Sequence, residues 1–149
     1  MNVIFCDIDG TINPLTYRGN DMFMEGKLEV LSEICNKTNS SIVISSSKKL
    51  CTKNRELAEE LKKTFSNYNI NFLGFTPSVP NPFKVHGQEM WKEWDIEYYL
   101  YLHPEIDKFC ILDDEDYDLS NYKDKLVFID YKTGITGYYT DEIIKKLNK

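Results

Sequence analysis

The chain has 149 residues, 42% of them hydrophobic, which is typical of one globular domain with a substantial core. No apolar run approaches the ~20 residues that a membrane-spanning helix needs. The net charge of −6 argues against broad nonspecific binding of nucleic acid, which requires a positive face. We therefore expect a single domain over residues 1–149, with no membrane association and no obligate protein partner.

Two features indicate a cytoplasmic protein. The segment Met1–Asp7 has no basic region and reaches an acid early, so we expect neither a secretory signal nor a transit peptide. The four cysteines lie far apart, without a CxxC pair: Cys6, Cys35, Cys51 and Cys110. Buried free thiols in a reducing compartment explain this spacing better than a zinc site or a disulfide framework.

Short apolar runs alternate with helical patterns along the chain. The runs that predict strands are Asn2–Cys6, Ser41–Ile44, Asn71–Phe75, Lys108–Leu112 and Lys125–Ile129. The patterns that predict helices are Lys27–Asn36, Asn54–Phe65, Gln88–Leu102 and Asp141–Leu147. This alternation predicts a Rossmann-like three-layer α/β sandwich, with a five-stranded, mostly parallel sheet and helices on both faces. Ligands of such sheets bind outside the carboxyl ends of the strands.

The third helical pattern is rich in aromatic residues. Its apolar spacing predicts an inward face made of Met90, Trp91, Trp94, Tyr98 and Leu102. A base-stacking surface is the alternative, but helical spacing favours packing in the core.

Acidic residues follow the first and the fourth predicted strands. Asp7 and Asp9 lie on the same side of the chain, so their carboxylates repel each other unless a cation or a proton lies between them. Gly10 allows the backbone to turn sharply there. Asp113 and Asp114 end the fourth run, and if the two strands are neighbours, the four acids converge. Mg²⁺ is the hard cation that such oxygen ligands prefer.

The acidic residues also allow two other interpretations. An EF-hand is excluded, because Arg18 takes the twelfth position of a loop that begins at Asp7, and Leu119 replaces the glycine of a loop that begins at Asp114. A solvated acidic turn over residues 113–118 stays open as an alternative.

The second predicted strand ends in hydroxyl-bearing residues. Ser45 and Ser46, followed by backbone N–H groups, could cradle phosphate oxygens, although serine runs are also common in turns. Lys84 is the best candidate for a cation that neutralises phosphate, with His86 as the competitor. A solvated loop lysine is the alternative for Lys84.

Taken in order, these motifs resemble the haloacid dehalogenase-like (HAD) phosphatase superfamily. They are Asp7-Ile8-Asp9-Gly10-Thr11, then Ser45, then Lys84, then Asp113-Asp114. A narrower set is similar to small HAD domains found alone or fused to RNA-repair enzymes: Gly74-Phe75-Thr76-Pro77, Gly87-Gln88-Glu89-Met90 with Trp94, Ile111-Leu112-Asp113-Asp114, and Thr133-Gly134-Ile135-Thr136. The chain departs from that group at Ser47 and Lys48, where an aromatic residue and an arginine are usual, and at His86, where arginine is common.

The resemblance implies roles for these residues. Asp7 would attack phosphorus to form an aspartyl-phosphate, and Asp9 would serve as general acid and base. The implied Mg²⁺ ligands are Asp7, the backbone carbonyl of Asp9, and Asp113 or Asp114. The groups implied to hold the phosphoryl oxygens are Ser45, Lys84 and the backbone of Gly10 and Thr11. Ser46 and Lys48, which follow the second predicted strand, are further candidates for contact with the substrate, and a solvated helix start is the alternative for Lys48.

The substrate class follows from the space left for a cap. Predicted helices and a strand fill the gaps between Thr11 and Ser45 and between Ser45 and Lys84, so only Asn13–Met24 remains for a short flap. We therefore expect an open site that suits a large phosphorylated substrate, with a polynucleotide end favoured slightly over a nucleotide or another small phosphomonoester. A catalytically idle HAD domain that binds phosphate or a protein is the alternative from a different class.

Overall fold

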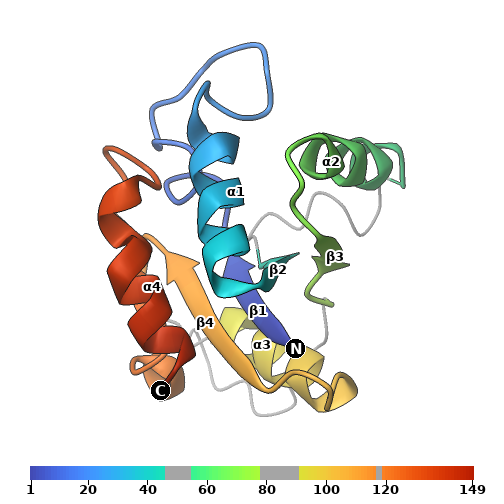
Figure 1. Ribbon diagram of the computed structural model, residues 1–149, viewed down its shortest axis with the longest axis vertical. Coiled ribbons are helices and arrows are strands. Elements are labelled where there is room, and N and C mark those ends of the chain that lie inside the picture. The colour runs from blue at the N-terminus through green and yellow to red at the C-terminus, as the bar shows by residue number, and fades with distance from the viewer. Residues whose placement is uncertain (46–54, 78–90, 117–118) are drawn as a thin grey trace.

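The computed structural model describes residues 1–45, 55–77, 91–116 and 119–149. Five parallel strands form one sheet in the order β3-β2-β1-β4-β5 (Figure 1). The strands are β1 (Asn2–Cys6), β2 (Ser40–Ile44), β3 (Phe72–Phe75), β4 (Lys108–Asp113) and β5 (Leu126–Phe128). Each predicted strand is therefore confirmed, with ends that differ by about one residue.

Four α-helices and two short 3₁₀ helices connect the strands. They are α1 (Lys27–Thr38), α2 (Arg55–Asn67), α3 (Trp91–Leu102), η1 (Ser120–Tyr122), η2 (Gly137–Tyr139) and α4 (Thr140–Leu147). The predicted start of the second helix at Asn54 and the predicted residues 88–90 of the third lie outside the described residues.

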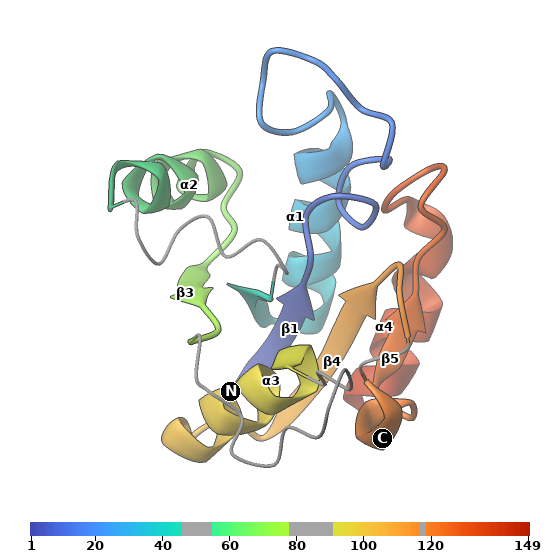
Figure 2. The ribbon, with the colours of Figure 1, turned by 180° about the vertical axis from the view of Figure 1, so that it is seen from behind.

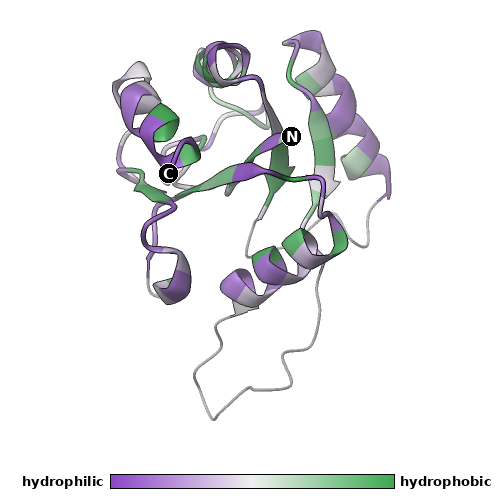
Figure 3. Ribbon diagram, turned by 60° about the horizontal axis from the view of Figure 1, so that its bottom comes forward, coloured by the Kyte–Doolittle hydropathy of each residue, from purple (hydrophilic) through white to green (hydrophobic). Residues whose placement is uncertain are grey.

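The sheet separates two apolar cores of unequal size. The side chains of Ile4 and Cys6 point into the larger core, which α1, α2 and α4 cover. Val3 and Phe5 point to the other face, where α3 and η1 pack. Figure 2 shows α3 lying across that second face, and Figure 3 shows apolar strands between helices whose outer sides are polar. The predicted three-layer arrangement is confirmed.

The central strands end level with one another. Cys6 at the end of β1 pairs with Ile44 of β2 on one side and with Leu112 of β4 on the other. Backbone hydrogen bonds continue one residue further, from Asp7 N to Leu112 O (3.3 Å) and from Ser45 N to Cys6 O (2.9 Å). This register places Asp7 and Ser45 side by side at the carboxyl edge of the sheet, next to Asp113.

The predicted inward face of α3 is wrong at Leu102, which is exposed. Trp94 and Tyr98 are only half-buried, and Met90 and the side chain of Trp91 lie outside what the structure describes. Instead Ile96 and Tyr99 pack on the sheet, with Tyr99 edge-on to Phe5 at a ring distance of 5.7 Å. Lys92 lies one turn before Ile96 on this buried face.

The thiol prediction is supported where it can be examined. Cys6, Cys35 and Cys110 are buried and free, and Cys51 lies outside the described residues. Burial raises the pKa of Cys35 to about 12 and also raises the pKa of Cys6 and of Cys110. These thiols therefore have the environment of inert core residues. None of the helices in the described ranges has the length and apolar character of a membrane span.

Candidate active site

Three carboxylates converge at the carboxyl edge of the sheet. Asp7 follows β1, Asp113 ends β4 and Asp114 comes directly after it. One oxygen from each lies within 4.8 Å of the others. The register of β1 and β4 causes this convergence, because the two strands are neighbours and end at the same level. The predicted meeting of the two acidic strand ends is therefore confirmed for three of the four acids, and the Asp9 carboxylate is not part of the group.

Asp113 is the most deeply buried of the three, with no solvent exposure. Its Oδ1 accepts a hydrogen bond from the backbone N–H of Glu115 (3.0 Å). Burial raises the pKa of Asp113 to about 7; the attraction of Lys92 opposes this shift, and the charge of Asp7 adds to it. A carboxyl group of this kind binds a proton or a metal ion near neutral pH.

Lys92 supplies a buried positive charge among these acids, and the sequence interpretation missed it. Its Nζ donates to Asp113 Oδ2 at 2.6 Å and to Asp7 Oδ2 at 3.5 Å, and the side chain is only 3% exposed. Helix α3, which covers the face of the sheet with the smaller core, holds Lys92 in this position. Buried lysines are rare unless they are paired, so this ion-pair cluster is a built feature of the site.

A tight turn joins Asp7 to the rest of the first motif. The carbonyl of Ile8 accepts hydrogen bonds from the N–H groups of Thr11, Ile12 and Asn13. Gly10 has a φ of +80°, and a Cβ at this position would lie 2.4 Å from Asp114 Oδ2. Only glycine therefore allows both the turn and the close approach of Asp114.

Thr11 links the turn to the fourth motif. It is fully buried, and its Oγ1 donates to Asp114 Oδ1 at 3.3 Å. Its backbone N–H is already engaged with Ile8 (3.2 Å), so the side chain and backbone of Thr11 position Asp114 and the turn. The contact of Thr11 with phosphate stays a prediction.

Ser45 carries a hydroxyl that is buried without satisfying its hydrogen-bonding capacity. Its side chain is 1% exposed, and no partner for its Oγ occurs in the described part of the chain. Most buried polar groups are satisfied, and exceptions are often functional. The hydroxyl follows β2 beside Asp7, where the sequence predicted a ligand for phosphate oxygens.

Asp9 lies at the outer side of the cluster. Its side chain is exposed, in contrast to that of Asp7, and its backbone forms an isolated bridge with Asn13. Asn13 in turn closes a loop: its Nδ2 donates to Met22 O and its Oδ1 accepts from Met24 N, both at 2.8 Å. The flap predicted over Asn13–Met24 is thus a fastened loop next to the acids (Figure 1, blue).

Four predicted site residues lie outside the described residues: Ser46, Lys48, Lys84 and His86. The choice between Lys84 and His86 for the third motif is therefore untested. Within the described ranges Lys92 takes the place beside Asp7 and Asp113. Its sequence signal was the i, i+4, i+7 spacing with Ile96 and Tyr99, which marks a second possible inward face of the helix.

The residues present fit a divalent cation. Three carboxylates lie within 4.8 Å of one another and one ammonium group pairs with two of them, so the cluster carries two uncompensated negative charges if all its members are ionised. All the donors are carboxylate oxygens, which suits a hard ion such as Mg²⁺. Asp7, Asp113 and Asp114 would hold it.

Comparison with known proteins extends this description. Neither the curated proteins nor the solved structures contain a match to the chain. The model of one family, described as the HAD domain in Swiss Army Knife RNA repair proteins, matches residues 3–138. The match includes both acidic strand ends, Ser45 and Lys92. Because it covers most of the chain, the protein belongs to this family of HAD domains.

Proposed function

We propose that the protein is a Mg²⁺-dependent phosphomonoesterase that acts through an aspartyl-phosphate. Membership of a HAD family supports a phosphatase-type hydrolase at the level of the superfamily. The observation that carries the finer proposal is the buried cluster of Asp7, Asp113 and Lys92, with Asp114 and the unsatisfied Ser45 hydroxyl at its edge.

In the proposed first step, a carboxylate oxygen of Asp7 attacks phosphorus, and the bond to the ester oxygen breaks. The exposed Asp9 gives its proton to the departing alcohol. In the second step Asp9 takes a proton from water, which attacks the aspartyl-phosphate and releases inorganic phosphate and the free Asp7 carboxylate. The chain thus returns to its starting state.

The other residues of the site would position and compensate charge. Lys92 holds the carboxylates of Asp7 and Asp113 in place, and Ser45 Oγ donates to a phosphoryl oxygen. Bound Mg²⁺ would neutralise charge on the phosphoryl group during transfer. A preorganised donor of this type typically contributes ~2.7–4 kcal/mol to lowering the barrier.

The substrate that we propose is a phosphorylated polynucleotide end. No cap domain occurs among the described residues, since the fastened loop over residues 13–24 is the only large insertion before α1. An open site leaves room for a large substrate. The family is named for RNA repair proteins, which favours an RNA end.

The basic test is hydrolysis of para-nitrophenyl phosphate by the purified protein. We expect activity with Mg²⁺, and its loss in EDTA or in Asp7→Asn. Asp124→Asn is the matched control, because this exposed aspartate precedes β5 at the end away from the site. Wild-type turnover no higher than that of Asp7→Asn would favour an idle binding domain.

A substrate panel tests the finer claim. Oligonucleotides with a 3′-phosphate or a 5′-phosphate, in RNA and in DNA, should be hydrolysed with a higher kcat/KM than free nucleotides. A strong preference for free nucleotides would overturn the argument from the open site and favour a small-molecule phosphatase.

A further inference from the structure

A hollow lined by aromatic side chains adjoins the candidate active site. It has a volume of ≈ 550 Å³, and its walls include Phe128, Tyr131, Tyr138 and Tyr139, together with Asp114 and Lys132. We call it the aromatic hollow. Asp114 belongs both to this hollow and to the carboxylate cluster, so the two sites are continuous. The volume lies in the range of small-ligand sites.

Three of the aromatic side chains are unusually open to solvent. Phe128 is 53% exposed, Tyr131 47% and Tyr138 86%. Single exposed apolar residues need no explanation, but several around one hollow indicate a binding surface. They come from β5, from the turn after it and from η2, so the fold gathers them from three consecutive elements.

The wall behind these residues is fixed. Tyr139 is buried, and its hydroxyl accepts a hydrogen bond from the backbone N–H of Asp130 (2.9 Å). Tyr138 lies edge-on to it, with ring centroids 5.3 Å apart. The N–H of Leu15 donates to Tyr131 O (2.8 Å), which ties the hollow to the loop after the first motif. A ligand would therefore meet the fixed ring of Tyr139 and a fixed backbone at Tyr131.

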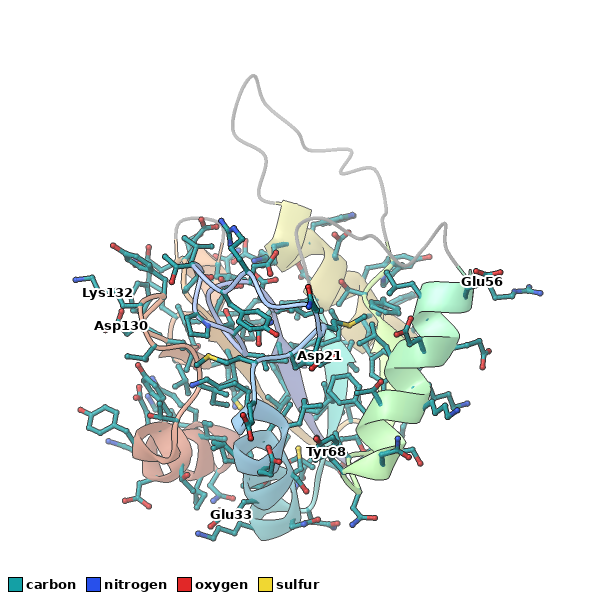
Figure 4. All side chains as sticks on the ribbon, turned by 90° about the horizontal axis from the view of Figure 1, so that it is seen from above. Asp21, Glu33, Glu56, Tyr68, Asp130 and Lys132 are labelled. Atoms are coloured by element: carbon teal, nitrogen blue, oxygen red, sulfur yellow. The ribbon has the colours of Figure 1, made fainter. Side chains whose placement is uncertain are left out.

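Charge indicates which part of a substrate fits here. Asp130 and Lys132 lie at one side of the carboxyl edge in Figure 4, and Glu142 completes the rim. With Asp114, the hollow has three carboxylates and one ammonium group, which disfavours a run of phosphates, yet suits a nucleobase, whose amino groups donate to carboxylates. Aromatic rings stack on bases of any sequence.

We propose that the aromatic hollow binds the base of the terminal nucleotide whose phosphate is removed at Asp7, with Tyr131 and Tyr138 as stacking residues. This inference rests on the proposed phosphatase function. It adds a binding site for the base, which is the part that distinguishes a nucleic-acid end from other phosphomonoesters. Lys132 is the cation placed to meet the adjoining phosphodiester.

The test compares three phosphomonoesters: an oligonucleotide with a terminal phosphate, the same oligonucleotide with an abasic terminal residue, and glycerol phosphate. Separate 3′-phosphate and 5′-phosphate arms identify the end that is used. Tyr131→Ala and Tyr138→Ala should each lower kcat/KM on the first substrate by about tenfold, mainly through KM, as expected for the loss of one stacked base. Both variants should match wild type on the other two substrates, and Tyr138→Phe should keep full activity.

Tyr101→Ala is the matched control, because Tyr101 is also an exposed tyrosine (80%) but lies near the C-terminal end of α3, the end opposite to Lys92. Equal losses on the abasic and normal oligonucleotides, or no loss on either, would overturn the proposal.

Fluorescence anisotropy with Asp7→Asn and the phosphorylated oligonucleotide adds a readout that needs no turnover. Base-dependent binding that the tyrosine variants weaken would support base binding in the aromatic hollow, even if the wild type proved inactive. Inactivity of the wild type together with such binding would overturn only the proposed catalysis. Turnover of glycerol phosphate without base-dependent binding would do the reverse.

Discussion

Replacing Lys92 by methionine should destabilise the metal-free protein by about 3–5 kcal/mol at pH 8, which is the cost of removing one partner from a buried ion pair. Methionine keeps an unbranched chain in the same space but removes the charge. The carboxylates of Asp7 and Asp113 would then face each other in a buried site without the ammonium group that now lies 2.6 Å from one and 3.5 Å from the other.

The two distances set the size of the electrostatic attraction that the substitution removes. At an effective dielectric constant of about 20, the attraction is about 6 kcal/mol over 2.6 Å and about 5 kcal/mol over 3.5 Å. Burial of the ammonium group in the wild type costs several kcal/mol, which offsets much of this attraction. A net loss of about 3–5 kcal/mol is what remains.

The loss should depend on pH in a defined direction. Burial raises the pKa of Asp113 to about 7, and removing Lys92 raises it further, because the lysine favours the ionised form. Below pH 6 this carboxyl group is protonated, so the repulsion that the variant suffers is smaller. The destabilisation should therefore be greater at pH 8 than at pH 5.5.

Urea denaturation in EDTA at both pH values measures this difference. Lys37→Met is the matched control, since Lys37 pairs with Glu33 on the exposed face of α1 and should cost no more than about 0.5 kcal/mol. A loss below about 1 kcal/mol at pH 8, or the same loss at both pH values, would refute the assignment of Lys92 as the charge partner of the site.

Four further predictions follow from the geometry. The pKa of Asp113 is higher in the folded than in the unfolded chain, so the folded state loses stability as pH rises from the unfolded-state pKa to about 7. The free energy of unfolding in EDTA should therefore fall over that window, and Asp113→Asn should flatten the curve. Over the same window the affinity for Mg²⁺, measured by calorimetry, should rise by up to about tenfold per pH unit, since the ion must displace that proton; a pH-independent affinity would contradict this. Gly10→Ala should abolish phosphatase activity and lower stability by more than Gly26→Ala, because both have a positive φ but only Gly10 has a neighbour where the Cβ would lie; equal effects would contradict this. The native protein should expose at most one thiol to Ellman's reagent, whereas all four should react in denaturant, because Cys6, Cys35 and Cys110 are buried; fast modification of two or more native thiols would argue against the fold.

The sheet could be predicted from the sequence because its strands are buried on both faces. Such strands appear as continuous apolar runs, and Asn2–Cys6 and Lys108–Leu112 are the clearest examples. Acids at the ends of both runs then indicated a shared site, since parallel strands end at one edge. Two adjacent strands were enough to bring Asp7 and Asp113 together.

Lys92 could not be predicted in the same way, because helix α3 has two plausible apolar faces. Tryptophans and tyrosines occur at several helical positions, so periodicity alone did not select the face that holds Ile96 and Tyr99. That choice depends on the shape of the second core, which is a tertiary property. A lysine on a buried face also violates the usual pattern, and such violations are common at functional sites.

The aromatic hollow was hidden for a different reason. Phe128 belongs to an apolar run that was interpreted as a fully buried strand, yet β5 is a short edge strand and leaves this ring at the surface. Tyr131 lies in a turn and Tyr138 in the short η2 helix, and no periodicity marks either of them. Only the three-dimensional path of the chain places these rings beside Asp114.

Because Lys92 lies on a helix that packs in the core, the packing of that helix determines the position of the Lys92 ammonium group. Ile96 and Tyr99 anchor α3 in the smaller apolar core, and Lys92 lies one turn before Ile96 on the same helix. A change in the side-chain volume of that core would shift α3 and move the ammonium group of Lys92 with it. Substitutions in the smaller core such as Ile96→Val should therefore change the rate of the proposed phosphatase reaction although every polar residue of the site stays in place.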